Sequence, residues 1–262
     1  MQYTKSNVCN ITESRQEELL EHYEGCICET ESCQLTSGCC CIDRFGPAYN
    51  TQGRLQHITP YGDCLTPVVE CNNNCTCEKS CINRVVQHGV TVNLQVFDVG
   101  LRGVGMRSLQ PIARGSFVCE YAGELLSHRS ARKRAATYKD PAKHNYILAV
   151  REFFGAKLLT TYVDATCVGN VGRFINHSCD PNLFVQPVRV ENAVPHVALF
   201  ALRDIPVFTE LTYDYSGGNS TADCSLTLPV DTNETNSFRK HCLCGSSQCR
   251  EILPYDDTLF TS

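Results

Sequence analysis

The feature of this sequence that most constrains its fold is a dense set of cysteines in the first third. The chain of 262 residues holds 19 cysteines, and eleven of them lie between Cys26 and Cys81. In residues 71–81, written CNNNCTCEKSC, only small or polar residues separate the four cysteines, so this stretch cannot be the apolar face of a helix or strand. Such thiols form disulfides in oxidising compartments and bind metals in reducing ones.

The N-terminal sequence favours the reducing alternative. The stretch MQYTKSNVCNITESRQEELL lacks an apolar signal core, and no run of roughly 18 apolar residues occurs elsewhere, so we expect neither a secretory signal nor a membrane span. The cysteine count is odd, which excludes complete internal disulfide pairing. We therefore expect an intracellular protein with metal-bound thiolates, and a disulfide-bonded module is the alternative.

The spacing of nine of these cysteines suits a shared zinc cluster. Structural zinc takes four tetrahedral ligands, so about six terminal and three bridging thiolates supply three complete sites. The predicted ligands of this cluster are Cys26, Cys28, Cys33, Cys39, Cys41, Cys71, Cys75, Cys77 and Cys81. Cys40 and Cys64 fall outside the spacing, and we expect them to be buried or spare thiols.

Composition and local pattern predict a β-rich region after this cluster. With 42% hydrophobic residues the chain can bury a sizeable core, and its net charge of -5 favours a basic partner over a nucleic-acid backbone. Two segments, 14–24 and 127–138, have a helical pattern, and the charges of 132–134 are expected on a solvated helix face. Short strands are predicted by β-branched and aromatic runs at 91–98, 116–125, 145–152, 158–165, 183–190 and 196–205.

A series of motifs after the cysteine cluster resembles one known family. They are GVG (103–105), EYAGE (120–124), NYI (145–147), GRFINHSCDPN (172–182), ELTYDYS (210–216) and CLCGSSQC (242–249). Their order resembles that of SET-domain protein lysine methyltransferases, and the nearest likeness is to the SET portion of SETMAR-like histone methyltransferases. The resemblance implies a mainly β fold of several small curved sheets with a pseudoknot. Zinc modules would flank it, a tri-zinc pre-SET module before it and a post-SET tail after it.

The resemblance also implies the division of the chain. We expect an N-terminal segment (1–24), a pre-SET zinc cluster (25–82, here called the head), a SET catalytic domain (83–216), a flexible connection (217–240) and a post-SET segment (241–262, here called the tail). Cys242, Cys244 and Cys249 are one thiolate short of a tetrahedral zinc site, and the family takes the fourth from the NHSC motif, which is Cys179 here. This fourth zinc would close the tail over the cofactor and the lysine channel.

Site residues follow from the same resemblance. Tyr121, Tyr213 and Tyr215 would line a narrow lysine channel, with the Tyr215 hydroxyl nearest the transferring methyl group. S-adenosylmethionine would be held by Arg102, Gly103, Val104, Tyr146, Arg173, Asn176 and His177, with valine at position 104 where the family usually has tryptophan. Methyl transfer to an amine needs aligned reactants and hydroxyl dipoles rather than an attacking side chain, and no metal at the reacting centre.

The sequence therefore predicts an S-adenosylmethionine-dependent protein lysine methyltransferase. The expected substrate is a histone-three tail in the nucleus, on the chromosome, with no membrane and no strong direct nucleic-acid binding. In the family, phenylalanine at the position of Tyr213 leaves room for three methyl groups, so tyrosine predicts mainly mono- and dimethyl-lysine. Lysine nine and lysine thirty-six of histone three both stay open as targets. A zinc-stabilised chromatin-binding scaffold without catalysis is the alternative function.

Overall fold

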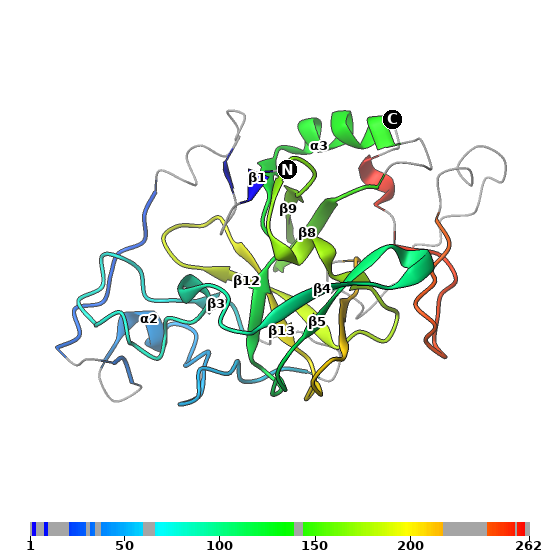
Figure 1. Cartoon of the computed structure of the whole chain (residues 1–262). Coiled ribbons are helices and arrows are strands. Elements are labelled where there is room, and N and C mark those ends of the chain that lie inside the picture. Colours follow the sequence, from blue (N-terminus) through cyan, green and yellow to red (C-terminus); the bar gives the residue numbers. More distant parts are fainter. Residues whose placement is uncertain are drawn as a thin grey trace.

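The computed structural model describes most of the chain as a β protein with short helices (Figure 1). Within the described residues, the strands form three four-stranded sheets and one two-stranded sheet. This arrangement confirms the mainly β fold expected from the sequence. The described residues are 2–3, 8–9, 21–29, 32–34, 38–59, 66–138, 144–216, 240–254 and 256–259.

One sheet brings together segments from three motifs. Its order is β11 (Asn176–His177), β14 (Glu210–Tyr213), β5 (Val104–Ser108) and β4 (Leu94–Asp98). The pairs β4–β5 and β5–β14 are antiparallel, and β11 runs parallel to β14. The parallel pair sets His177 directly beside Tyr213. The NHSC and LTYDY motifs are therefore neighbours in space.

A second sheet is buried on both faces. Its order is β3 (Val68–Val69), β12 (Leu183–Arg189), β13 (His196–Ala201) and β6 (Phe117–Glu120). Because successive strand residues point to opposite faces, Leu199 and Val197 join one apolar cluster and Phe200 joins another. The Phe200 ring lies 5.6 Å from that of Phe117 and 6.1 Å from that of Phe184, measured between centroids. Truncating such a residue to alanine costs about 3–5 kcal/mol.

The third sheet supports the main helix. Its order is β2 (Val8–Cys9), β7 (Glu124–Leu126), β9 (Lys157–Asp164) and β8 (Ile147–Phe154), and a small separate pair joins β1 (Gln2–Tyr3) to β10 (Val168–Gly169). Helix α3 (His128–Ala135) packs Ala131 and Ala135 against Leu126 and Tyr162 of this sheet. These alanines are four residues apart, which places them on the same helix face.

Helix α3 begins where the sequence predicted. The Ser127 hydroxyl accepts a hydrogen bond from the Ser130 amide at 3.2 Å, which caps the first turn. The helix continues into a 3-10 turn, η5 (Ala136–Tyr138), so the predicted helical segment 127–138 is confirmed. The other predicted helix fails where it can be checked, because residues 21–24 are not helical, while 14–20 lie outside the described residues. Among the described residues, every helix is too short or too polar to cross a lipid bilayer.

Cysteine side chains form the interior of the head. Its buried cluster consists of cysteines together with Ile42, which lies in α2 (Cys40–Asp43). The fully buried carboxylate of Glu70 joins this region to the following chain, because it accepts hydrogen bonds from the Tyr49 hydroxyl at 2.7 Å and the Val86 amide at 2.7 Å. Val86 begins the 3-10 turn η3 (Val86–His88). The head thus has no ordinary hydrophobic core of its own within the described residues.

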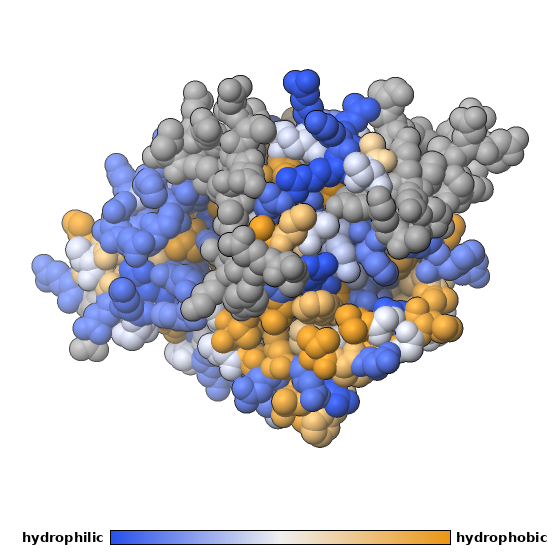
Figure 2. All heavy atoms as spheres, turned by 45° about the horizontal axis from the view of Figure 1, so that its top comes forward, coloured by the Kyte–Doolittle hydropathy of each residue, from blue (hydrophilic) through white to orange (hydrophobic). Residues whose placement is uncertain are grey.

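Hydrophilic and apolar side chains are unevenly spread over the surface. Figure 2 shows hydrophilic side chains over much of the upper and left parts of the view, and apolar ones gathered in its lower middle. The exposed apolar side chains of the chain include Val96, Leu101, Val104, Val207 and Phe208. Leu101 lies in the 3-10 turn η4 (Gly100–Arg102), which connects β4 to β5. This turn is part of the predicted cofactor site.

Candidate active site and metal centres

Three tyrosine side chains come together at the centre of the molecule. The ring of Tyr213 lies 4.9 Å from that of Tyr215 and 6.2 Å from that of Tyr121, measured between centroids. The Tyr121 hydroxyl donates to the Tyr146 carbonyl at 2.7 Å, and the Tyr215 hydroxyl donates to the Ile175 carbonyl at 3.0 Å. The structure therefore brings together the three residues predicted to form the channel.

The three phenols are kept protonated by their surroundings. Burial raises the pKa of Tyr121 and Tyr213 well above the ordinary value, and the neighbouring tyrosines add to the effect. Burial also raises the pKa of Tyr215. Because a buried phenolate is poorly solvated, these groups act as neutral dipoles across the pH range in which a lysine amine titrates. The site can orient an amine but holds no phenolate to deprotonate it.

The predicted cofactor residues of the first sheet meet around a carboxylate that the sequence did not single out. Arg102 donates to both oxygens of Glu210, at 3.0 and 2.8 Å. The Asn176 amide donates to the Val104 carbonyl at 3.1 Å and to Glu210 at 3.1 Å. A paired, bidentate arrangement of this kind fixes the direction of the arginine. Glu210 thereby holds two predicted cofactor residues in one geometry.

Two glycines at this turn and the start of β5 are required for different reasons, Gly103 by its backbone conformation and Gly105 by close packing. Gly103 has a φ of 76°, a left-handed conformation that side chains disfavour, and a Cβ built on it would point into open space. At Gly105 a Cβ would lie 3.0 Å from a Glu210 oxygen and 3.2 Å from the Asn176 amide nitrogen. The backbone at Gly103 is therefore accessible to a ligand, whereas Gly105 is closely packed against Glu210 and Asn176. Val104 between them is 47% exposed, so a ligand can cover it.

The remaining predicted cofactor residues form a second edge of the site. The guanidinium of Arg173, in the 3-10 turn η6 (Val171–Phe174), lies 4.0 Å from the centroid of the Tyr146 ring. Arg173 also donates to the Thr166 carbonyl at 3.2 Å. Stacking of a cation on an aromatic face is worth about 0.5–2 kcal/mol and orders both groups. The cationic and aromatic groups suit a ligand with a carboxylate and a planar base, as S-adenosylmethionine has.

His177 connects the tyrosines with the tail. Its Nδ1 accepts a hydrogen bond from the Tyr215 amide at 3.2 Å, and its Nε2 lies 3.3 Å from the Cys179 sulfur. Burial is the main cause that lowers the pKa of His177 to about 4, so the ring is neutral at physiological pH. Since Nδ1 is an acceptor, the remaining ring proton is on Nε2 and points toward Cys179.

Four thiols at the tail fit a single zinc ion. The sulfurs of Cys179, Cys242, Cys244 and Cys249 all lie within 4.8 Å of one another. The Arg250 amide donates to the Cys179 sulfur at 3.3 Å, an interaction that stabilises a thiolate. Arg250 also pairs with Asp214 at 2.8 Å, one residue before Tyr215. Four thiolates in this arrangement suit tetrahedral zinc, and the tail is anchored at both Cys179 and Asp214.

The thiols of the head form overlapping groups rather than separate ones. Three four-sulfur groups, each compact enough for one metal ion, share Cys26, and pairs of them share Cys33, Cys39 or Cys71. The members of these groups are Cys26, Cys28, Cys33, Cys39, Cys41, Cys71 and Cys77. Shared sulfurs are what a bridged cluster requires, so the donor set fits several zinc ions.

The other predicted head ligands lie beside these groups. The Cys75 sulfur is 3.7 Å from that of Cys41, and the Cys81 sulfur accepts from the Cys33 amide at 3.3 Å. Cys40 is exposed and outside the groups, which agrees with its exclusion as a ligand. Cys64 lies outside the described residues. The number of zinc ions in the head stays a prediction.

Comparison with known proteins gives consistent matches over nearly the whole chain. A family model described as SET domain matches residues 103–216. Human histone-lysine N-methyltransferase SETMAR is 42% identical over 241 residues, or 91% of this chain and 34% of the human protein. The bovine protein of the same name is 41% identical over 91% of this chain and 76% of its own length.

Solved structures give the same result. The methyltransferase domain of human SETMAR has a TM-score of 0.78 and 38% identity, covering 97% of this chain and 89% of that one. KRYPTONITE, in complex with mCHH DNA, an H3(1-15) peptide and SAH, has a TM-score of 0.69 and 30% identity, covering 96% of this chain and 47% of that one.

Proposed function

Because this chain belongs to the SET-domain family of histone-lysine N-methyltransferases, we propose that it transfers methyl groups from S-adenosylmethionine to a lysine of the histone-three tail. The observation that carries the proposal is the convergence of Tyr121, Tyr213 and Tyr215 within one buried cluster. The H3(1-15) peptide in the KRYPTONITE complex supports histone three as the source of the lysine. The net charge of -5 suits a basic tail.

The chain's own residues would act on the lysine by orientation. Bound S-adenosylmethionine supplies an electrophilic methyl group on a positively charged sulfur. The hydroxyls of Tyr121 and Tyr215 donate their protons to main-chain carbonyls, which leaves their oxygen lone pairs free to accept a hydrogen bond from the amine. They can hold the amine with its nitrogen lone pair in line with the methyl group, which is the geometry that an in-line displacement needs. Burial of the channel disfavours the charged ammonium form, because that form loses its hydration there.

The cofactor would lie between the two edges of the site. Arg102, Gly103, Val104 and Asn176 would hold it on the side of Glu210, and Tyr146 with Arg173 on the other. His177 would complete the set next to the tyrosines, where it accepts a hydrogen bond from the Tyr215 amide. The zinc ions of the head and the tail would have structural roles only. We assign both edges to one ligand because each edge reaches the tyrosines: the Tyr146 carbonyl accepts from Tyr121, and His177, next to Asn176, accepts from the Tyr215 amide.

Turnover of the unmodified protein tests this proposal. A radiolabelled methyl-transfer assay on core histones should show incorporation, and Tyr215→Phe should reduce it by at least about 100-fold, or 2.7 kcal/mol. An array of histone-three peptides then identifies the lysine. A silent assay from protein that still binds S-adenosylhomocysteine would contradict the proposal and favour a chromatin-binding scaffold.

The number of methyl groups added would depend on Tyr213. Its side chain is 2% exposed and lies against both other tyrosines, so its hydroxyl can hold a channel water in the space that a further methyl group needs. We expect mainly mono- and dimethyl-lysine, and a shift toward trimethyl-lysine in Tyr213→Phe. Mass spectrometry of a peptide driven to completion measures the products, and dominant trimethylation by the unmodified enzyme would contradict this assignment.

Histone substrates place the expected activity in the nucleus, on chromatin. The relatives named above are histone-lysine N-methyltransferases, which supports this location. Fractionation of cells that express the tagged chain would test it, and recovery outside the chromatin fraction would count against it.

A further inference from the structure

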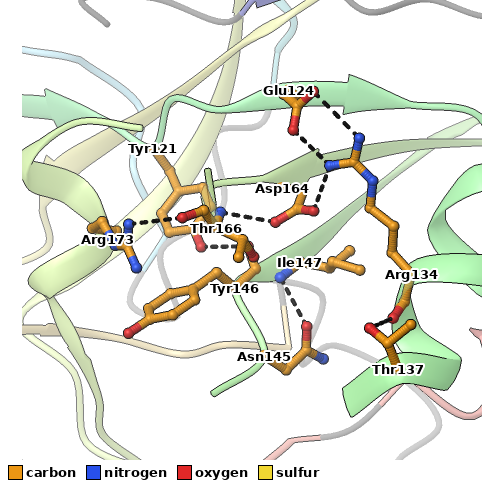
Figure 3. A network of polar contacts seen from close by, with 10 residues as sticks. All are labelled: Tyr121, Glu124, Arg134, Thr137, Asn145, Tyr146, Ile147, Asp164, Thr166 and Arg173. Carbon is orange, nitrogen blue, oxygen red and sulfur yellow. Dashed lines mark hydrogen bonds and ion pairs between the residues drawn. The ribbon is translucent and has the colours of Figure 1, made fainter. Parts of the chain in front are cut away.

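A buried ion pair links helix α3 to the edge of the active site (Figure 3). The Asp164 carboxylate, at the end of β9, is fully buried, and one of its oxygens lies 2.8 Å from a guanidinium nitrogen of Arg134. The same nitrogen lies 2.6 Å from Glu124 on the adjacent strand β7. A carboxylate in this environment needs its cation, because an unpaired buried charge is costly.

The second oxygen of Asp164 fixes the loop that follows β9. It accepts a hydrogen bond from the Thr166 amide at 2.9 Å, which closes a turn over Ala165. The carbonyl of Thr166 in turn accepts from Arg173 at 3.2 Å. The direction of the Arg173 guanidinium therefore depends on a loop whose shape Asp164 sets.

The same loop reaches the lysine channel through one carbonyl group. The Ala165 amide donates to the Tyr146 carbonyl at 3.2 Å, and the Tyr121 hydroxyl donates to that same carbonyl at 2.7 Å. Arg173 stacks on the ring of Tyr146 at 4.0 Å. Figure 3 shows Tyr121, Tyr146 and Arg173 grouped on one side of Asp164, with Arg134 on the other.

We propose that Asp164, held by Arg134, is a positioning residue for both the cofactor edge and the lysine channel. It touches neither reactant. It orders residues 164–166. In this loop the Thr166 carbonyl holds Arg173, and the Ala165 amide holds the Tyr146 carbonyl. The Tyr146 carbonyl in turn fixes the Tyr121 hydroxyl. This inference rests on the proposed function, since it assumes that Tyr146 and Arg173 contact S-adenosylmethionine.

Replacement of Asp164 by asparagine tests the role with little change of shape. An asparagine side chain has one acceptor oxygen, so it cannot serve Arg134 and the Thr166 amide at once, and either arrangement disturbs the loop. The matched control is Glu124→Gln, which removes one carboxylate charge from the same arginine and leaves the Asp164 to Thr166 hydrogen bond in place. Arg134→Lys keeps the positive charge and serves as the conservative variant.

The readouts are the Kd for S-adenosylhomocysteine by calorimetry, KM and kcat for methyl transfer, and the Tm. We expect Asp164→Asn to raise the Kd for S-adenosylhomocysteine and the KM for S-adenosylmethionine by about 10-fold each. It should also lower kcat by about 10-fold. Glu124→Gln should lower the Tm about as much as Asp164→Asn does, while its Kd and KM stay within about twofold of the unmodified values. Arg134→Lys should fall between them.

Equal changes in Kd for Asp164→Asn and Glu124→Gln would overturn the inference, because the effect would then be one of stability. If Asp164→Asn does not fold, Arg134→Lys decides, and an unchanged Kd with a lowered Tm in that variant would also overturn it. If the unmodified enzyme is active and the variants keep its Kd, KM and kcat, only this inference is contradicted. An unmodified protein that neither binds S-adenosylhomocysteine nor transfers methyl groups contradicts the proposed function as well.

Discussion

The head and the tail both gather cysteine thiols, but the two sets have different surroundings. In the head, Cys33, Cys39 and Cys71 are at most 1% exposed, and thiols make up nearly all of the buried cluster. In the tail, most of the thiols are partly exposed, and Cys179 lies 3.3 Å from the ring of His177, which bonds Tyr215. The same ligand chemistry thus replaces a hydrophobic core in one region and secures an active site in the other.

The largest expected effect is the loss of folding when a head ligand is removed. Binding of structural zinc is worth about 10–16 kcal/mol in small peptides, which is as large as the whole stability of about 5–15 kcal/mol of a typical domain. We expect Cys75→Ser to give no soluble folded protein. The control is Cys40→Ser, which changes an exposed thiol that is not among the nine predicted ligands and should leave the yield and the Tm unaltered. A folded Cys75→Ser protein would show that folding does not depend on the head thiols more than on the tail thiols.

Metal removal should proceed in two steps. Because the tail thiols are more exposed, a chelator should first remove about one zinc per chain and stop turnover while the circular dichroism spectrum persists. The release of about three further zinc ions should coincide with unfolding, since cysteines form nearly all of the head's own buried cluster. Elemental analysis and activity, followed together, measure both steps. Simultaneous loss of all metal would show that the two regions do not differ in this respect.

Removal of a tail ligand should affect catalysis rather than folding. In Cys249→Ser the predicted zinc site of the tail loses one of its four thiolates, and the metal no longer links the tail to Cys179. We expect kcat/KM to fall by at least about 100-fold, or 2.7 kcal/mol, while the Tm changes by less than about 3 °C. Near-normal turnover would show that the tail is dispensable.

A smaller effect is expected at the residue between the tail and the tyrosines. His177→Gln keeps an acceptor oxygen and a donor NH2 group, but both lie at the end of one flexible chain and do not reproduce the fixed positions of the two ring nitrogens toward the Tyr215 amide and the Cys179 sulfur. We expect kcat to fall about 10-fold, or 1.4 kcal/mol, with the tail zinc retained. Loss of that zinc in His177→Gln would mean that the histidine supports the metal site rather than the position of Tyr215.

The smallest predicted effect is a pH dependence at the junction of the head with the sheets. Burial alone would lower the pKa of His196, but its hydrogen bond to Glu120 and the charges of Glu120, Glu70 and Glu191 raise it above the ordinary value. The stabilisation is therefore complete below the unfolded-state pKa of about 6.5 and is lost as the pH rises through the folded-state pKa. We expect a decrease in Tm of about 2 °C between pH 6 and 9, absent in His196→Gln. An equal decrease in that variant would assign the effect to other groups.

Local sequence patterns predicted the elements whose stability is itself local. Helix α3 has its cap at Ser127 and its buried alanines four residues apart, all within one short segment. The tyrosine and cysteine sets were found differently, through motifs whose spacing resembles a family, and the structure brings both sets together. The segment 21–24 was predicted as helix because its charges and leucine-rich neighbours suit one, yet in the structure the Tyr23 amide bonds Glu191, far along the chain.

The residues that sequence reasoning missed are carboxylates that are buried or half-buried. Glu210, Asp164 and Glu70 each accept hydrogen bonds that hold other functional or structural segments in place. A glutamate or aspartate at a strand end has the same local sequence whether it is solvated or buried, and most are solvated. The partner of Glu210 is 108 residues away in sequence, so no local window contains the information. The acidic residue inside the ELTYDYS motif was the available signal.

The parallel pairing of β11 with β14 has a consequence for the order in which the protein is made. The strand that carries Asn176 cannot find its partner until the ribosome has produced Tyr213, and Arg102 waits for Glu210 over 108 residues. Closing such distant contacts is slow compared with forming a hairpin or a helix. At about 5–20 residues per second of synthesis, the head is complete several seconds before the strand that carries Glu210 and Tyr213 has been made. The cysteines of the head are therefore available to a metal ion well before the candidate active site can be completed.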